Sequence, residues 1–203
     1  MRNPTRRSRN IGKTQGGRVK DGRATEKWSR MFPESKWHQI SESETAWQTF
    51  VENPSKDFYH PCSPSDYLSV LRRLPGHHTE DIKGIILRRT PKRDSRLGID
   101  AWRRYSCIIM NAFPSSNKFT YPYKPKESQV SFFKPFCDRW KEDNGTWTLE
   151  WEPEEVQRYY LYQVFLHEIG HINDWSRTSQ TKRENYADSF ARDMAEFLGE
   201  RSK

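Results

Sequence analysis

The segment that begins at Pro153 constrains the fold most strongly. Pro153 is followed by Glu154 and Glu155, and this order is typical of the first turn of an α-helix, where the helix dipole favours acidic residues. From Tyr159 to Ile172 the segment is apolar on nearly every side. Because a helix that is apolar all round must be buried, we expect a central helix with the rest of the domain packed around it.

This apolar helix contains the polar motif His167-Glu168-Ile169-Gly170-His171. Its two histidines are four residues apart, which places them on one helical face and lets both imidazoles reach one tetrahedral metal ion. A glutamate beside the first histidine can take a proton from a water molecule at the metal. The alternative is a pair of hydrogen-bonded core histidines with a paired glutamate. Burying unpaired polar groups is costly, so the context favours a metal site.

A zinc site needs a third protein ligand, and three carboxylates follow the motif: Asp174, Glu184 and Asp188. Asp174 lies so close to His171 in sequence that it would crowd the histidines. Asp188 lies one turn after Glu184, so both acids can face the same cleft. Glu184 also has a competing interpretation, because Thr181-Lys-Arg-Glu184 matches a capping box in which the glutamate bonds back to the backbone of Thr181.

The motif His-Glu-x-Gly-His, followed by Glu-x-x-Ala-x-x-Phe-Ala from Glu184 onward, resembles the zincin superfamily on its glutamate-ligand (gluzincin) branch. Within that branch it resembles the ImmA/IrrE group of zinc peptidases, over residues 160–195. The resemblance implies that His167, His171 and Glu184 bind Zn²⁺, that Glu168 is the catalytic base and that Asp188 orients a ligand histidine. It implies hydrolysis of peptide bonds in a protein or peptide substrate. No helix-turn-helix module is evident, so substrate and regulation do not carry over.

The group that stabilises the oxyanion is not assigned by this pattern. His77, His78 and Tyr186 are candidates for that role. The two adjacent histidines follow Pro75-Gly76, and a plain loop pair explains them better than a catalytic role.

Positive charge is concentrated at the start of the chain. Residues 1–30 hold ten basic and two acidic residues, a net charge of +8 that equals the net charge of the whole chain, so residues 31–203 are neutral overall. The first 27 residues have almost no apolar side chains, so we predict a disordered basic arm over 1–30, followed by a zincin-like metallopeptidase domain over 31–203. The arm is either a weak nucleic-acid contact or a solvated tail that aids solubility.

The remaining elements follow from local patterns. We predict a helix that begins at Ser41 and ends before Asn53, a helix from Pro64 to Leu74, and a last helix from Thr181 to about Leu198. In the last helix we expect Ala187, Phe190, Ala191, Met194 and Phe197 to face inward. Short apolar runs predict central strands over 82–89 and 105–113. A turn at Asn144-Gly145 predicts a β-hairpin, and the Pro-rich residues 114–138 predict irregular surface structure at the rim of a cleft.

Together these patterns predict an α+β fold: a minimal zincin-like domain with a small sheet packed on a central HExxH helix and a following ligand-bearing helix. No run approaches the roughly 20 apolar residues of a membrane span, and no apolar signal-peptide region begins the chain. Three cysteines, Cys62, Cys107 and Cys137, are expected to be reduced thiols of a cytoplasmic protein.

The leading functional hypothesis is a zinc metallopeptidase. One alternative is a DNA-associated regulatory protein in which the metal is structural; another is a toxin or effector protease with the same chemistry. The fourth ligand position separates the first alternative from catalysis, because structural zinc sites are closed by four protein ligands while catalytic sites keep one position open.

Overall fold

The computed structural model describes residues 47–104, 106–174 and 179–200, and this part of the chain is a mixed α+β fold. The basic arm over 1–30, the domain boundary after it and the start of the helix predicted from Ser41 lie outside the described residues. The helical elements are α4 (Pro64–Arg73), η1 (Gly76–His78), α5 (Lys92–Leu97), α6 (Glu127–Phe133), α7 (Pro153–Tyr159), η2 (Tyr160–Phe165), α8 (Leu166–Asn173) and α9 (Gln180–Phe197). The strands are β1 (Gln48–Val51), β2 (Phe58–Tyr59), β3 (Gly84–Arg88), β4 (Ala101–Arg104), β5 (Cys107–Asn111), β6 (Phe113–Pro114), β7 (Lys118–Tyr121), β8 (Trp140–Asp143) and β9 (Thr146–Glu150).

The main sheet has four strands in the order β1-β3-β5-β4. β3 pairs in parallel with both β1 and β5, and β4 runs antiparallel to β5 at one edge. Every residue of β3 and β5 is buried, with Ile85 opposite Ile108. The two strands predicted over 82–89 and 105–113 are therefore confirmed as central strands, which are apolar because both of their faces are covered.

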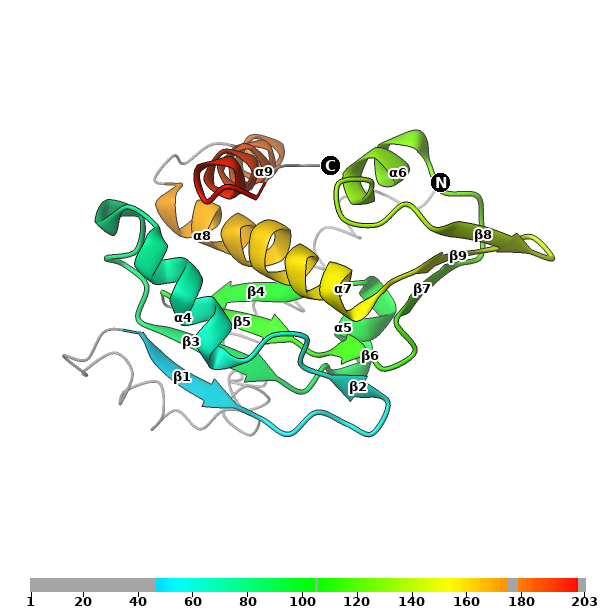
Figure 1. Cartoon of the computed structure of the whole chain (residues 1–203), viewed down its shortest axis with the longest axis horizontal. Coiled ribbons are helices and arrows are strands. Elements are labelled where there is room, and N and C mark those ends of the chain that lie inside the picture. The colour runs from blue at the N-terminus through cyan, green and yellow to red at the C-terminus, as the bar shows by residue number, and fades with distance from the viewer. Residues whose placement is uncertain (1–46, 105, 175–178, 201–203) are drawn as a thin grey trace, which may run out of the picture. The chain divides into compact units, whose positions relative to one another are not determined.

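The predicted central helix is confirmed as a continuous rod formed by α7, η2 and α8. Its middle segment, η2, is π-helical. In Figure 1 the rod runs in yellow to orange between the four-stranded sheet and α9. Phe165, Leu166 and Ile169 of the rod share one buried core with Ile85 and Ile108 of the sheet. The site motif thus lies on the most enclosed helix of the described part of the chain.

Other elements agree with the sequence patterns. The predicted hairpin is present as β8 and β9, and its turn residues Asn144 and Gly145 have φ of 49° and 77°, the left-handed pair that a tight hairpin turn requires. α4 begins at Pro64 as expected and buries Leu71. The free thiols Cys62, Cys107 and Cys137 are all buried. None of the described helices has the length and apolar character needed to cross a membrane.

The helix predicted from Ser41 to Asn53 is wrong over Gln48–Val51, which form β1. Trp47 has a left-handed φ of 58°, a conformation that a right-handed helix does not allow. Phe50 then pairs with Ile86 of β3 in a parallel ladder. The apolar residues of this segment have helical spacing, but pairing with β3 determines its structure. Because β3 is distant in the sequence, a local pattern does not reveal this pairing.

The prediction of irregular structure over 114–138 is wrong in part, because this segment contains β7 and α6. Its prolines lie outside β7 and α6: Pro114 ends the short strand β6, and the others are Pro122, Pro125 and Pro135. The sequence patterns also missed α5 and β4. In α9, Ala187, Phe190 and Ala191 are buried as expected and Met194 packs against the core, whereas Phe197 is exposed. The next residue, Leu198, is buried in its place at the end of the helix.

Candidate metal centre

The first half of the centre comes from α8. His167 and His171 project from the same face of the helix, and their rings are perpendicular with centroids 4.6 Å apart. Both side chains are mostly buried, because α9 covers this face of α8. The helix thus fixes two imidazoles side by side before any other element contributes.

Glu184 of α9 supplies the third donor. Its Oε2 atom lies 3.4 Å from Nε2 of His167 and 3.4 Å from Nε2 of His171. The three donor atoms all lie within 4.8 Å of one another. A tetrahedral zinc ion with bonds of about 2.0–2.2 Å holds its ligand atoms roughly 3.3–3.6 Å apart, so the two 3.4 Å separations fit a shared zinc ion.

The start of α9 removes the competing interpretation of Glu184. The helix begins at Gln180 with Ser179 as its N-cap, so Thr181 is already inside the first turn. Glu184 is therefore not at the position that a capping-box glutamate takes, three residues after the N-cap. The capping-box alternative is wrong, and the carboxylate faces the two histidines instead.

Close packing of α8 and α9 holds Glu184 at this distance. A Cβ atom added to Gly170 would lie 2.9 Å from Cα of Ala187 and 3.0 Å from Cβ of Phe190. Only a glycine lets the two helix backbones approach so closely. The small residues in His-Glu-x-Gly-His and Glu-x-x-Ala thus have a physical role, which is to set the spacing between the donors on the two helices.

Asp188 lies one turn after Glu184 and contacts the other ring nitrogen of His167. Nδ1 of His167 donates a hydrogen bond to Oδ1 of Asp188 at 2.8 Å. This bond fixes the orientation of the ring and leaves the lone pair of Nε2 directed toward Glu184. The remaining carboxylate, Asp174, lies 3.4 Å from Nε of Arg183 in an ion pair and is not among the converging donors.

Burial controls the electrostatics of the centre. It raises the pKa of Glu168 to about 7, and the Glu184 carboxylate adds to this rise while the charge of His167 opposes it. Burial lowers the pKa of His171, as does the neighbouring His167. For His167, burial is outweighed by the hydrogen bond to Asp188 and by nearby carboxylates, so its pKa is raised. A carboxyl group that titrates near neutral pH is suited to accept and return a proton.

The three oxyanion candidates have other contacts. Nδ1 of His78 lies 3.2 Å from Oδ1 of Asn173, and its ring stands edge-on to Phe190. Asn173 is two residues beyond His171, about 200° around the helix, and so faces away from the donors. His77 packs on His78, and Tyr186 contacts Phe190. Among the described contacts, none links His77, His78 or Tyr186 to the metal donors.

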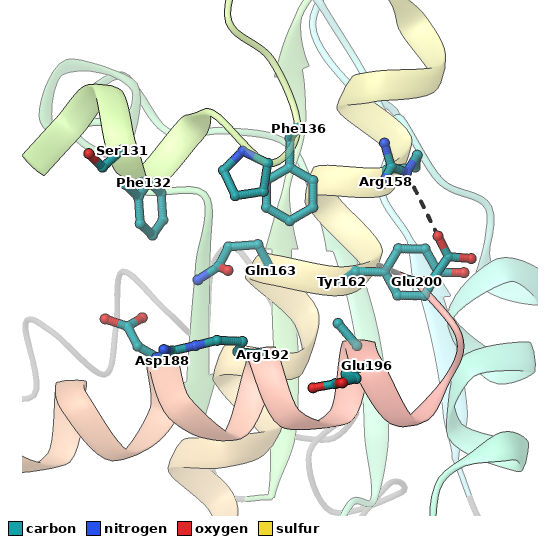
Figure 2. Close-up of a pocket in the computed structure, with 12 residues that line it drawn as sticks. Ser131, Phe132, Phe136, Arg158, Tyr162, Gln163, Asp188, Arg192, Glu196 and Glu200 are labelled. Atoms are coloured by element: carbon teal, nitrogen blue, oxygen red, sulfur yellow. Dashed lines mark ion pairs between the residues drawn. The ribbon is translucent and has the colours of Figure 1, made fainter. Parts of the chain in front are cut away.

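A pocket of about 600 Å³ adjoins the centre between α6, the rod and α9 (Figure 2). Asp188 belongs both to the pocket wall and to the centre. Phe132 and Phe136 line the side that comes from residues 114–138, which the sequence placed at the rim of a cleft. Gln163 and Arg192 line the opposite side. Sequence reasoning missed these two, although Gln163 lies one turn before His167 and shares its side of the helix.

Comparisons of the chain with protein-family models, with curated proteins and with solved structures find no match. The interpretation of the centre therefore depends on its geometry.

Proposed function

We propose that the protein is a zinc-dependent metallopeptidase that hydrolyses peptide bonds of a protein substrate. The observation that carries this proposal is the convergence of Nε2 of His167 and Nε2 of His171 on one carboxylate oxygen of Glu184, each at 3.4 Å. Two imidazoles and a carboxylate are a donor set that zinc accepts in catalytic sites.

The number of donors favours catalysis over a structural role for the metal. In the described ranges, three His, Cys, Asp or Glu side chains converge at this point, and none joins them as a fourth donor. A structural zinc site is closed by four protein ligands, whereas a catalytic one leaves a position for water or substrate. This supports the peptidase over the alternative of a DNA-associated regulator with a structural metal.

The residues of the centre have separate tasks in the proposed reaction. Zinc in such a site acts as a Lewis acid that polarises a carbonyl and acidifies water. Glu168, whose pKa is raised to about 7 by burial, takes a proton from the attacking water and delivers it to the leaving amine. Asp188 holds the ring of His167 through the 2.8 Å hydrogen bond, so that Nε2 keeps its direction.

The adjoining pocket supports a polymeric substrate. Its volume of about 600 Å³ is within the range of sites that enclose a ligand group. Its wall of Phe132 and Phe136 suits an apolar side chain, and the amide of Gln163 suits a peptide backbone (Figure 2). We assign this pocket to a substrate side chain next to the scissile bond.

The test is the Glu168→Gln variant, assayed on denatured casein with the products sequenced by mass spectrometry. Glutamine has the same shape but cannot act as a base, so we expect at least a ~10²-fold loss of hydrolysis with zinc content unchanged. Glu80→Gln is the matched control, because Glu80 is an exposed acid outside the centre. Full activity of Glu168→Gln, or wild-type protein that holds zinc and cleaves no peptide bond, would overturn the proposal.

A further inference from the structure

Positive charge is concentrated in a second region of the chain, over α5 and β4. Residues 83–104 hold eight basic and two acidic residues, which gives eight minus two, or +6. Residues 31–203 as a whole are neutral, so the rest of this part carries −6. The neutral body of the chain is therefore strongly polarised, and the metal centre does not use its basic region.

Both acids of this region are turned away from the surface. Asp94 is buried and accepts hydrogen bonds from the Arg88 guanidinium at 2.5 Å and from Nε1 of Trp102 at 2.9 Å. Asp100 accepts a hydrogen bond from the hydroxyl of Tyr159 at 2.8 Å. Neither acid offsets the positive charge that α5 and β4 present to solvent.

The cations on the outside have no such partners. Lys92, Arg93 and Arg96 of α5 and Arg103 of β4 are all exposed. Within the described ranges, none of these four forms an ion pair with a carboxylate. Unpaired cations of this kind are available for an external anion.

Trp102 places an aromatic ring beside the cations of α5. Its side chain is 37% exposed, although its Nε1 atom is bonded to Asp94 of α5. The guanidinium of Arg88 forms an ion pair with Asp94, and its Nε atom donates a hydrogen bond to Oδ1 of Asn111 at 3.0 Å. This buried network fixes α5 against the edge of the sheet. We define the basic face as Lys92, Arg93, Arg96 and Trp102; Arg103, the next residue along β4, points to the other side of the sheet.

We propose that the basic face binds single-stranded nucleic acid. Its cations would contact successive phosphates, and the exposed ring of Trp102 would stack on one unpaired base. Cations around an exposed aromatic ring are the combination by which proteins hold single strands, since every base has a stacking face and every linkage carries a charge. An acidic peptide would use the cations but has no need of the ring. The proposal is independent of the metal centre and of the arm over 1–30.

The experiment measures binding of the full chain to a fluorescein-labelled 20-nucleotide single-stranded DNA, by anisotropy, over a series of salt concentrations. The face variant is Lys92→Gln/Arg93→Gln/Arg96→Gln. The matched control is Lys124→Gln/Lys126→Gln/Lys134→Gln, which removes the same charge from three other exposed lysines. The arm is present in both variants, so it contributes equally to both.

For the face variant we expect Kd to rise at least about tenfold at low salt, and the slope of log K against log salt to fall by about 2, since each lost phosphate contact on a single strand removes about 0.7. The control should bind within about twofold of the wild type. Equal losses in both variants would show that net charge or the arm is responsible, and would overturn the proposal. Absence of binding by the wild-type chain would overturn it as well.

Trp102→Leu tests the stacking contact separately. We expect Kd to rise about 5- to 100-fold with the salt slope unchanged, because stacking releases no counterions. Trp102→Phe keeps a ring but loses the hydrogen bond to Asp94, so it should bind close to the wild type. If Phe weakens binding as much as Leu, the ring only supports α5 and the stacking contact is refuted.

Discussion

The two helices that carry the centre differ in how they are held. On α8 the side chains of His167 and His171 are 19% and 11% exposed, whereas on α9 those of Glu184 and Asp188 are 46% and 44% exposed. α8 continues a rod that is buried against the sheet, while α9 lies across it with one face in solvent (Figure 1). The histidines are thus fixed by the core, and the carboxylates are brought to them by the docking of a second helix.

The centre therefore has two separate requirements, which are the spacing of its histidines and the position of its carboxylate. The spacing of the histidines is a property of one helix and needs only that α8 forms. The position of Glu184 depends on the contact of Gly170 with Ala187 and Phe190. Changes on α9 should therefore alter the centre without unfolding the domain, and changes at the contact between the helices should alter both.

The largest effect is expected from the carboxylates of α9. Glu184→Ala should lose zinc almost completely, because a ligand is removed. Asp188→Ala should weaken zinc affinity only about 10- to 100-fold, because it removes the partner of a ligand. Both residues are about half-exposed, so neither change should lower the melting temperature of the zinc-free protein much. Zinc titration with a competing chelator measures both affinities, and full zinc in Glu184→Ala beside an empty Asp188→Ala would reverse the two roles.

The next effect is expected at the contact between the helices. In Gly170→Ala the new methyl group would meet the backbone of Ala187 at 2.9 Å, so α9 must move away. We expect a destabilisation of about 1–3 kcal/mol, as for an overpacked core, together with weaker zinc binding because Glu184 is displaced. Gly76→Ala is the control, because nothing lies within 4 Å of its added atom. Urea unfolding and zinc titration should show both losses in Gly170→Ala. A loss of stability with unchanged zinc affinity would show that the contact at Gly170 does not position Glu184.

A smaller, pH-dependent effect is expected beneath the rod. Burial raises the pKa of Asp100 to about 6, although the hydrogen bond from Tyr159 lowers it. The unfolded chain therefore releases this proton at lower pH than the folded chain, and stability falls as pH rises from about 4 to 6. Asp100→Asn carries no such charge, so from pH 4 to pH 7.5 it should gain up to about 3 kcal/mol relative to the wild type. The measurement is the free energy of unfolding of both proteins as a function of pH. A constant difference between the two proteins from pH 4 to pH 7.5 would contradict this account.

What the sequence predicted well was local. The spacing of His167 and His171, the hairpin turn and the long apolar helix each depend on neighbouring residues, and the structure contains all three elements. The position of Glu184 beside the histidines was implied by the resemblance, and the local sequence left a capping box open as the alternative. The physical reason for its position, the close approach of the two helices at Gly170, is visible only in three dimensions.

What the sequence did not predict depends on distant contacts. Gln48–Val51 form a strand because they pair with β3. Trp102 belongs to a strand because β4 pairs with β5. The positive charge of residues 83–104 can be counted in the sequence, but its placement cannot. Only the structure shows that Asp94 and Asp100 bond to Arg88 and Tyr159 while the cations of α5 are exposed.

The central claim is tested most directly by anomalous diffraction at the zinc edge from crystals of the zinc-loaded protein. The account predicts one strong peak about 2.0–2.2 Å from Nε2 of His167, Nε2 of His171 and a carboxylate oxygen of Glu184, with no fourth protein ligand. A peak bound to Asp188 instead of Glu184, a peak closed by four protein ligands, or no peak between the two helices would contradict it.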